Sequence, residues 1–307
     1  MKILCLTPIK HLDGVYEHLE SFGTVDYHPS LSKESIRGLV HSFDYDVIFC
    51  NPNKQNYLLD EYILGKFNGT ILTASTGLNH IDLDYCSKRD IKVLSHKGDM
   101  ELINQLPSTA ELAFGLMLSV LRNIPSSFDD VKNGGWDYDK FMGHQLKGKT
   151  IGIIGYGRLG KMMSKYCEAF GMEVLKYDPY VIKSGYHLDY ILKNSNIISL
   201  HVHANDETRH IIDKKVLGKM KNNSYIVNTS RGEIVDECDI IESLRDGKLK
   251  GYATDVIEDE YSTEDGPILE GVNEGLNIIV TPHVGGMTWE GQQKAYMWSI
   301  SKLKELI

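Results

Sequence analysis

The chain has 307 residues, of which 42% are hydrophobic and 24% charged, the balance of a globular protein with a sizeable core. This length predicts two domains rather than one. With 33 Lys and Arg against 42 Asp and Glu, the net charge of −9 argues against nucleic acid or an anionic membrane as a partner. The five cysteines are scattered without zinc spacing, and no apolar run could span a bilayer. We therefore expect a cytoplasmic protein that uses no metal.

Short apolar runs alternate with stretches of helical spacing along most of the chain. The first series of predicted strands is Lys2–Leu6, Val25–His28, Asp46–Cys50, Thr70–Thr73 and Ile91–Leu94. The second is Thr150–Ile154, Glu173–Tyr177, Ile197–Leu200, Tyr225–Asn228, Gly251–Asp255 and Ile278–Val280. Alternation of this kind predicts an α/β protein with two doubly wound parallel sheets, each covered by helices on both faces.

The region between the two series carries a different pattern. Ser108-Thr109-Ala110-Glu111 reads as a capping box, with Ser108 as the N-cap. The helix that follows, from Leu112 to about Asn123, is apolar almost all round, which predicts burial on several sides. We expect it between the two domains or at a subunit interface.

A glycine-rich turn joins a predicted strand to a predicted helix near the middle of the chain. The apolar strand Thr150–Ile154 runs into Gly155-Tyr156-Gly157-Arg158-Leu159-Gly160, and the next strand ends at Asp178. This strand, turn, helix and acidic residue form the context that a dinucleotide-binding motif requires. A purely structural glycine turn is the alternative interpretation.

Each part of the turn has a physical role in cofactor binding. Gly155 permits the tight turn, Gly157 lets the backbone approach a pyrophosphate, and Gly160 lets the helix pack closely. The helix N-terminus offers free N–H groups to the phosphates. Asp178 can accept hydrogen bonds from the ribose hydroxyls and repels a 2′-phosphate, which predicts NAD rather than NADP.

Three later segments follow predicted strands, where open α/β sheets place their ligands. Arg231 lies in a turn after the fourth strand of the second series, and its guanidinium could clamp a carboxylate. The acidic stretch 255–260 follows the next strand, and His283 follows the last. Taken singly, each also fits a structural role. Together they supply the anion clamp, the carboxylate and the imidazole that reduction of a 2-keto acid requires.

Over essentially its whole length the chain resembles the D-2-hydroxyacid dehydrogenases. The shared motifs are Gly155–Gly160 with Asp178, Asn228–Asp236, Gly251–Glu260, Thr281–Gly286, Ser75–Asp82 and Thr109–Leu112. Within that family, the segments Lys140–Thr150 and Tyr177–Tyr180 are similar to those of D-3-phosphoglycerate dehydrogenases.

The resemblance implies a role for each matching residue. Arg231 would bind the substrate carboxylate and carbonyl, His283 would be the acid/base, and Glu260 would hydrogen-bond this histidine. The cofactor would be contacted by the glycine turn, Asp178, Thr229 and Asp255. The substrate carboxylate would meet backbone N–H groups of Ser75, Thr76, Gly77 and Leu78.

The resemblance also implies an architecture. A Rossmann NAD-binding domain, residues 99–284, would be inserted into a flavodoxin-like substrate-binding domain formed by residues 1–98 and 285–307. Such proteins are usually homodimers, and the interface would involve the helix around 112–121 and the segment after it.

Some positions depart from the family pattern and leave the substrate open. Thr73 stands where phosphoglycerate enzymes have an Arg, Tyr261 stands where many members have a Pro, and the loop Ser95–Pro107 is longer than usual. The expected substrate pair is therefore 3-phosphoglycerate and 3-phosphohydroxypyruvate, or a related small acid. The alternative is an NAD(H)-sensing or corepressor-like protein on the same fold.

Overall fold

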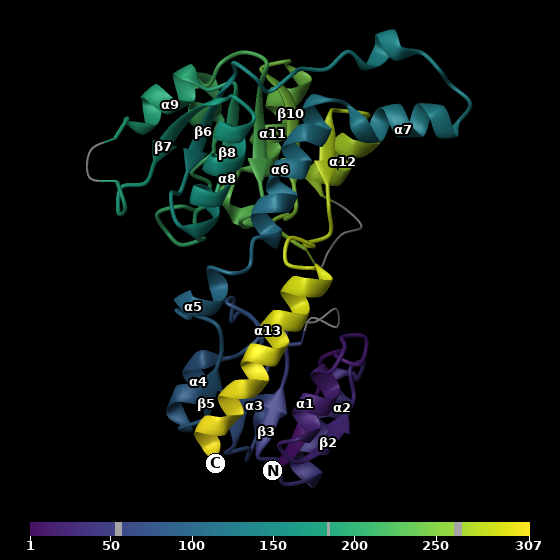
Figure 1. Cartoon of the computed structure of the whole chain (residues 1–307), viewed down its shortest axis with the longest axis vertical. Helices are drawn as coiled ribbons and strands as arrows, with labels where there is room; N and C mark the ends of the chain where they lie inside the picture. The colour runs from purple at the N-terminus through teal and green to yellow at the C-terminus, as the bar shows by residue number, and fades with distance from the viewer. Residues whose placement is uncertain (53–56, 183–184, 261–265) are drawn as a thin grey trace. The chain divides into compact units, whose positions relative to one another are not determined.

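The chain folds into two compact units in the computed structural model, which describes residues 1–52, 57–182, 185–260 and 266–307 (Figure 1). Unit 1 comprises Met1–Leu106 and Met287–Ile307, and unit 2 is the single stretch Pro107–Gly286. The chain passes from one unit to the other after Leu106 and after Gly286. The predicted boundaries, after residues 98 and 284, lie eight and two residues earlier. Within the described ranges no helix is both long and apolar enough to cross a bilayer.

Unit 1 is built on a parallel sheet with the strand order β2-β1-β3-β4-β5. Its strands are β1 (Lys2–Cys5), β2 (Thr24–Tyr27), β3 (Val47–Phe49), β4 (Thr70–Leu72) and β5 (Lys92–Leu94). Its helices are α1 (Val15–Glu20), α2 (Lys33–Ser42), α3 (Glu61–Leu64), α4 (Leu83–Lys88), α5 (Met100–Ile103) and α13 (Trp289–Ser301), followed by the 3-10 turn η3 (Lys302–Leu306).

Both faces of this sheet are covered. Successive residues of a strand point to opposite sides, so Ile3 and Leu4 belong to two different apolar clusters. The cluster around Ile3 is completed by Tyr296 and Ile300 of α13, which binds the C-terminal piece of the chain to the sheet. Burial on both sides explains why β3 reads as a continuous apolar run rather than an alternating one.

Unit 2 is built on a second parallel sheet, with the order β11-β10-β9-β8-β6-β7. Its strands are β6 (Thr150–Ile154), β7 (Glu173–Tyr177), β8 (Ile197–Leu200), β9 (Ser224–Asn228), β10 (Leu249–Thr254) and β11 (Ile278–Val280). Its helices are α6 (Ser108–Leu121), α7 (Ile124–Lys132), α8 (Arg158–Ala169), α9 (Leu188–Asn194), α10 (Lys214–Lys219), α11 (Glu237–Arg245) and α12 (Pro267–Asn273), with 3-10 turns η1 (Tyr138–Phe141) and η2 (Gly232–Ile234).

These two sheets confirm the predicted fold class, and every predicted strand is present with its ends shifted by two residues or fewer. In unit 2 the chain moves from β6 outward to β7 and then back past β6 to β8. The two neighbours of β6 are therefore reached in opposite directions, and open α/β sheets bind their ligands at such a switch point.

The start of α6 corrects one expectation. Ser108 is not the N-cap but the first helical residue, because Pro107 occupies the N-cap position. The Pro107 carbonyl accepts hydrogen bonds from the N–H groups of Ala110 and Glu111 at 2.8 and 3.1 Å. Proline suits this end of a helix, since it has no N–H to leave unbonded and its φ is already helical.

Helix α6 belongs to the core of unit 2. It packs against α8 and the strands β9 to β11, and Ala113, Met117 and Val120 share an apolar cluster with Ile151. Figure 1 shows α6 alongside α8 on one face of the sheet. The expected burial is confirmed, and this packing accounts for it within a single unit.

Candidate active site

The glycine turn lies at the switch point of the unit 2 sheet, directly after β6. Gly155 has a φ of +91°, which favours glycine, and a Cβ at this position would lie 2.4 Å from the carbonyl oxygen of His201 after β8. A Cβ on Gly160 would lie 2.1 Å from the carbonyl oxygen of Gly155, so α8 packs tightly onto the turn. A Cβ on Gly157 would meet no described atom within 4 Å, and this backbone therefore faces open space. Arg158 and Leu159 form the first turn of α8.

Asp178 follows β7 and reaches back to the glycine turn. One carboxylate oxygen accepts the N–H of Tyr156 at 2.8 Å. The other accepts the N–H groups of Tyr180 and Val181 at 2.9 and 3.0 Å. A carboxylate oxygen has two lone pairs, so the oxygen bonded to Tyr156 retains one for a further donor such as a ribose hydroxyl.

The described residues at this edge suit a dinucleotide. Gly157 leaves the backbone open at the N-terminus of α8, a twelve-residue helix whose free N–H groups favour an anion. The hydroxyl of Thr229, just after β9, is buried and has no hydrogen-bond partner among the described residues. A buried polar atom without a partner is costly, so a bound group that hydrogen-bonds Thr229 would remove a penalty.

Arg231 lies on a turn that Asn228, the last residue of β9, holds in place. The Asn228 side chain accepts the N–H of Ser230 at 3.0 Å and donates to the carbonyl of Arg231 at 2.9 Å. The hydroxyl of Ser230 donates to the carbonyl of Leu200 in β8 at 2.8 Å. The turn is thus fixed to two strands, while the Arg231 side chain is half-buried and bonded only through Nη1 to the Ser230 carbonyl at 2.7 Å, as far as the described residues show.

His283 occupies a strained turn that is held by Asp255. Its φ of +54° is uncommon for a residue with a side chain. Asp255 is buried, and its carboxylate accepts the Thr281 hydroxyl at 2.5 Å and the N–H groups of Val284 and Gly285 at 2.8 and 2.7 Å. The N–H of His283 itself donates to the Asp255 carbonyl at 2.9 Å. Four bonds to one residue therefore fix the backbone on both sides of the imidazole.

Glu260 meets the other side of the imidazole ring. His283 Nδ1 and Glu260 Oε2 are 2.8 Å apart. Because an ionised carboxylate only accepts, Nδ1 carries the proton, and Nε2 is left for another partner. An imidazole oriented in this way by a carboxylate is the arrangement of a general acid/base.

The predicted substrate loop, Ser75 to Leu78, lies in unit 1 and follows β4. A network of neutral side chains holds its beginning: Asn51 Oδ1 accepts the N–H of Ala74 at 2.7 Å and the Thr73 hydroxyl at 3.0 Å. The backbone N–H of His96 donates to the Ser75 carbonyl at 3.1 Å. Thr73 is fully buried and its hydroxyl also lies 3.2 Å from His80 Nε2, so this side chain is part of the support.

The structure brings together the predicted residues of unit 2 in two groups, one at the glycine turn and one at the His283 turn. The glycine turn joins Asp178, Glu260 joins His283, and Asp255 joins the His283 turn. Tyr261 lies outside the described residues. The role of Asn228 in holding the Arg231 turn was not predicted. An Asn at the end of a strand, directly before a turn, is the sequence feature that could have indicated it.

A sheet with a dinucleotide turn at its switch point, beside an imidazole–carboxylate pair, defines an NAD-binding α/β protein of the dehydrogenase class. Residues 114–285 match the model of the NAD binding domain of the D-isomer specific 2-hydroxyacid dehydrogenases. The chain therefore belongs to this family, and the family expected from the sequence is confirmed.

Several curated relatives match most or all of the chain. A D-3-phosphoglycerate dehydrogenase of Methanocaldococcus jannaschii is 34% identical over 100% of this chain and 57% of its own length. A hydroxypyruvate reductase of Thermotoga maritima is 37% identical over 79% of each chain. The present chain thus spans little more than half of the first relative.

Among solved structures, a D-lactate dehydrogenase of Aquifex aeolicus in complex with NAD and lactic acid is similar over 100% of this chain and 95% of its own. The TM-score is 0.79 and the sequence identity 27%. The fold found for both units is therefore that of the family.

Proposed function

We propose that the protein is an NAD-dependent dehydrogenase that interconverts a small D-2-hydroxy acid and its 2-keto acid. The observation that carries this proposal is the bond between His283 Nδ1 and Glu260 Oε2 at 2.8 Å, on a turn that Asp255 fixes. Family membership and the names of the relatives support the same reaction class.

The bound cofactor supplies a hydride to C2 of the keto acid. His283 donates the proton at Nε2 to the carbonyl oxygen, while Glu260 keeps the ring oriented and stabilises the charged imidazole. Arg231 holds the substrate carboxylate and polarises the carbonyl, since its guanidinium remains charged and forks onto an anion. From the resemblance to the family, backbone N–H groups of Ser75–Leu78 would also bind the substrate carboxylate. In oxidation, His283 takes the proton back.

We propose NAD rather than NADP as the cofactor partner of the glycine turn. Asp178 keeps a lone pair for a ribose hydroxyl, and its negative charge would oppose a 2′-phosphate. The unpartnered hydroxyl of Thr229 provides a further contact for the bound dinucleotide. Asp255 would also contact the cofactor, although three of its acceptor positions already serve the His283 turn.

For the substrate pair we propose 3-phosphoglycerate and 3-phosphohydroxypyruvate or a related small acid. Relatives include a D-3-phosphoglycerate dehydrogenase and a hydroxypyruvate reductase, which favours three-carbon acids. Thr73 is buried and bonded to Asn51, so this position offers no cation to a phosphate. Unphosphorylated acids therefore belong in the same test.

The test is NADH oxidation with 3-phosphohydroxypyruvate, hydroxypyruvate, glyoxylate and pyruvate, together with NADH binding followed by fluorescence. We expect turnover, with the highest kcat/KM for 3-phosphohydroxypyruvate. A higher value for another of these acids would change the substrate and leave the reaction. Tight NADH binding without turnover of any acid would favour the NAD(H)-sensing alternative.

We further propose that the protein is a homodimer in which the segment after α6 lies in the interface. Several large apolar side chains of this segment are exposed, among them Phe128 at 65%, Trp136 at 84% and Met142 at 82%. Figure 1 shows α7 and the trace after it running outward from the rest of unit 2. Exposed apolar clusters mark contact surfaces. Sedimentation should give a dimer at micromolar concentration, and Phe128→Glu with Trp136→Glu should give a monomer.

A further inference from the structure

Three segments interlock at the edge of the unit 2 sheet that carries the site. They are residues 203–213 after β8, residues 229–237 after β9 and residues 255–260 after β10. The first two pair through their backbones: the N–H of His210 donates to the Glu233 carbonyl at 2.8 Å, and the N–H of Asp236 donates to the Ile212 carbonyl at 2.9 Å.

The backbones of the second and third segments lie in direct contact at Gly232, where there is no room for a side chain. A Cβ on Gly232, next to Arg231, would lie 2.0 Å from the backbone carbon of Ile257 and 2.2 Å from the nitrogen of Glu258. The same Glu258 N–H donates to Oε1 of Glu237 at 2.8 Å. Glu237 is buried, and burial raises the pKa of its carboxyl. The turn that carries Arg231 thus supports the backbone of the segment that carries Glu260.

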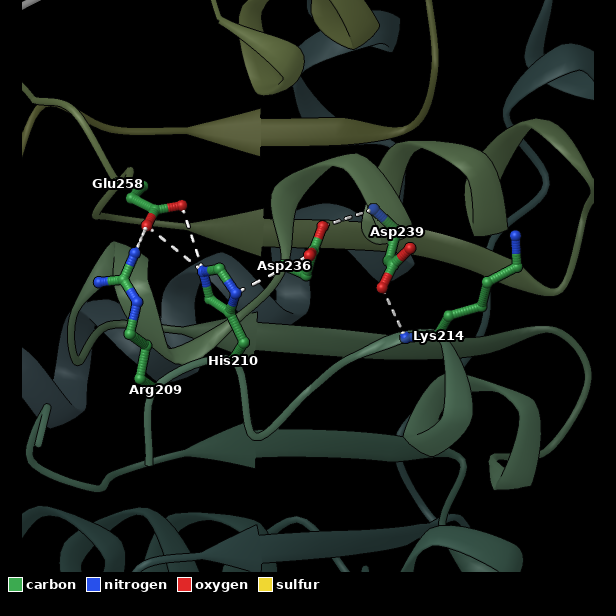
Figure 2. Close-up of polar contacts among 6 residues, drawn as sticks. All are labelled: Arg209, His210, Lys214, Asp236, Asp239 and Glu258. Carbon is green, nitrogen blue, oxygen red and sulfur yellow. Dashed lines mark hydrogen bonds and ion pairs between the residues drawn. The ribbon is translucent and has the colours of Figure 1, made fainter. Parts of the chain in front are cut away.

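The first segment holds the side chain of Glu258 (Figure 2). Arg209 forms an ion pair with its carboxylate, and His210 Nε2 lies 3.3 Å from both carboxylate oxygens. On the other side of the ring, His210 Nδ1 lies 3.8 Å from Asp236. His210 has a φ of +48°, so its backbone is held in a conformation that side chains disfavour.

Strained backbone persists only where the surroundings enforce it, and it gathers at functional sites. His210 shares this property with His283, the predicted acid/base. At His210 the enforcing contacts are the pairing with Glu233 and the carboxylates of Glu258 and Asp236. The residues that make these contacts all belong to the two segments that carry Arg231 and Glu260.

We propose that Arg209 and His210 are positioning residues that hold Glu258 and thereby set the orientation of Glu260 toward His283. They act on the reaction through Glu260. Only Asp259 separates Glu258 from Glu260, so the backbone between the residue that is held and Glu260 is short. The inference rests on the proposed dehydrogenase function, but not on which acid is the substrate.

We call Arg209 and His210, which hold Glu258, the clamp. The test compares a variant of the clamp with a matched control. Arg209→Gln combined with His210→Asn removes the ion pair and the imidazole, and asparagine tolerates the left-handed backbone. Lys214→Gln is the control, because it also removes one positive charge and an ion pair, that of Lys214 Nζ with Glu242 at 2.8 Å. The assay acid is 3-phosphohydroxypyruvate, or hydroxypyruvate if the former is not turned over.

We expect the clamp variant to lower kcat about 10- to 100-fold, because small displacements of a catalytic group have effects of this size. The KM of the acid and the Kd of NADH should change less than about twofold, and Lys214→Gln should match the parent. In a Glu260→Gln background the clamp substitutions should lower kcat less than about twofold further, because their effect passes through Glu260. A full additional loss in that background, or an unchanged kcat in the clamp variant, would overturn the proposal.

Hydrogen–deuterium exchange gives a readout that does not depend on turnover. The amide of Glu258 should exchange about tenfold faster in the clamp variant, while amides of β6 and α8 stay protected. If the double variant does not fold, Glu258→Gln replaces it, since this change keeps the backbone bond to Glu237. If no acid is turned over by the parent, the proposed function fails, and unchanged exchange at Glu258 would still overturn the clamp.

Discussion

Both units carry their predicted site residues on loops that follow the strands of a parallel sheet. The predicted site uses side chains in unit 2 and backbone N–H groups in unit 1. In unit 2, parallel strands end in turns that present the ionisable side chains of Arg231, Glu260 and His283, and Asn228 and Asp255 hold two of these turns. In unit 1, the loop after β4 is held by Asn51, and its backbone is the part predicted to bind substrate.

The supports differ in charge. Asp255 is an ionisable carboxylate that accepts three hydrogen bonds, whereas the unit 1 loop is supported by neutral groups such as Asn51 and His96. A neutral support leaves no fixed charge under a loop that is proposed to bind an anion. A charged support is acceptable in unit 2 because its lone pairs are satisfied by the turn. In this protein the predicted backbone site has neutral polar support, while the predicted side-chain site has a carboxylate beneath it.

The largest expected effect comes from removing a side chain of the predicted unit 2 site. His283→Ala should lower kcat by about a thousandfold or more, because the proton donor is lost, with NADH binding retained. Stopped-flow turnover and NADH fluorescence titration measure the two quantities. His187→Ala is the control, since that exposed histidine makes no cap bond to α9 among the described residues. Turnover near the parent value in His283→Ala would remove the catalytic assignment.

Arg231→Ala should lower kcat/KM about 100- to 1000-fold through lost binding and orientation of the substrate carboxylate. Arg231→Lys should recover only part of this loss, because an ammonium lacks the fork of a guanidinium. Steady-state kinetics over a range of keto acid concentrations separates KM from kcat. Full recovery in Arg231→Lys would mean that charge alone is recognised there.

The backbone half of the comparison is tested at Asn51. Asn51→Ala removes the acceptor for the Ala74 N–H and the Thr73 hydroxyl, and should raise the KM of the keto acid about tenfold while destabilising the protein by about 1–3 kcal/mol. The Kd of NADH should stay within about twofold, since the glycine turn lies in unit 2. Asn51→Asp keeps the acceptor but places a negative charge beneath the loop, so it should also raise the KM of the anionic keto acid. An unchanged KM in Asn51→Ala would separate this support from substrate binding.

The last prediction concerns the dependence of stability on pH. Burial lowers the pKa of His80 and of His96 to about 4, below the ordinary value of about 6.5. The unfolded chain takes up these protons near pH 6.5 and the folded chain only near pH 4, so stability is full above 6.5 and falls as the pH drops toward 4, by at most about 3 kcal/mol for each.

Urea unfolding between pH 7.5 and 4.5 measures this slope. His96→Gln should flatten it, because glutamine can still meet the Ala295 carbonyl and the Ser299 hydroxyl but does not titrate. An equal slope in the variant and the parent would show that His96 is not buried as a neutral ring. His201 also has its pKa lowered to about 4 by burial, so the variant and not the parent alone is decisive.

Much of the fold could be predicted from the sequence because its strands are buried on both faces. Runs such as Ile197–Leu200 are short, apolar and bounded by turns, and their ends agree with the structure. The predicted N-cap of α6 was wrong. Ser108 and Glu111 match a capping box, but Pro107, one residue earlier, already has helical dihedral angles. A local pattern could not decide between two neighbouring starts.

The pairing of Glu260 with His283 was predicted by resemblance, and its geometry agrees. The supports of the site were not predictable in the same way. Glu237 and His210 bond to residues that are distant in sequence, and these bonds depend on which strands are neighbours. A residue pattern along one chain segment contains no such information.

The arrangement of unit 1 around a later part of the chain has a consequence for biosynthesis. The face of its sheet that includes Ile3 and Phe49 is completed by α13, which follows all of unit 2 in the sequence. A ribosome therefore releases the whole of unit 2 before it supplies the helix that covers this face. Until then an apolar surface of the nascent chain remains uncovered and prone to aggregation.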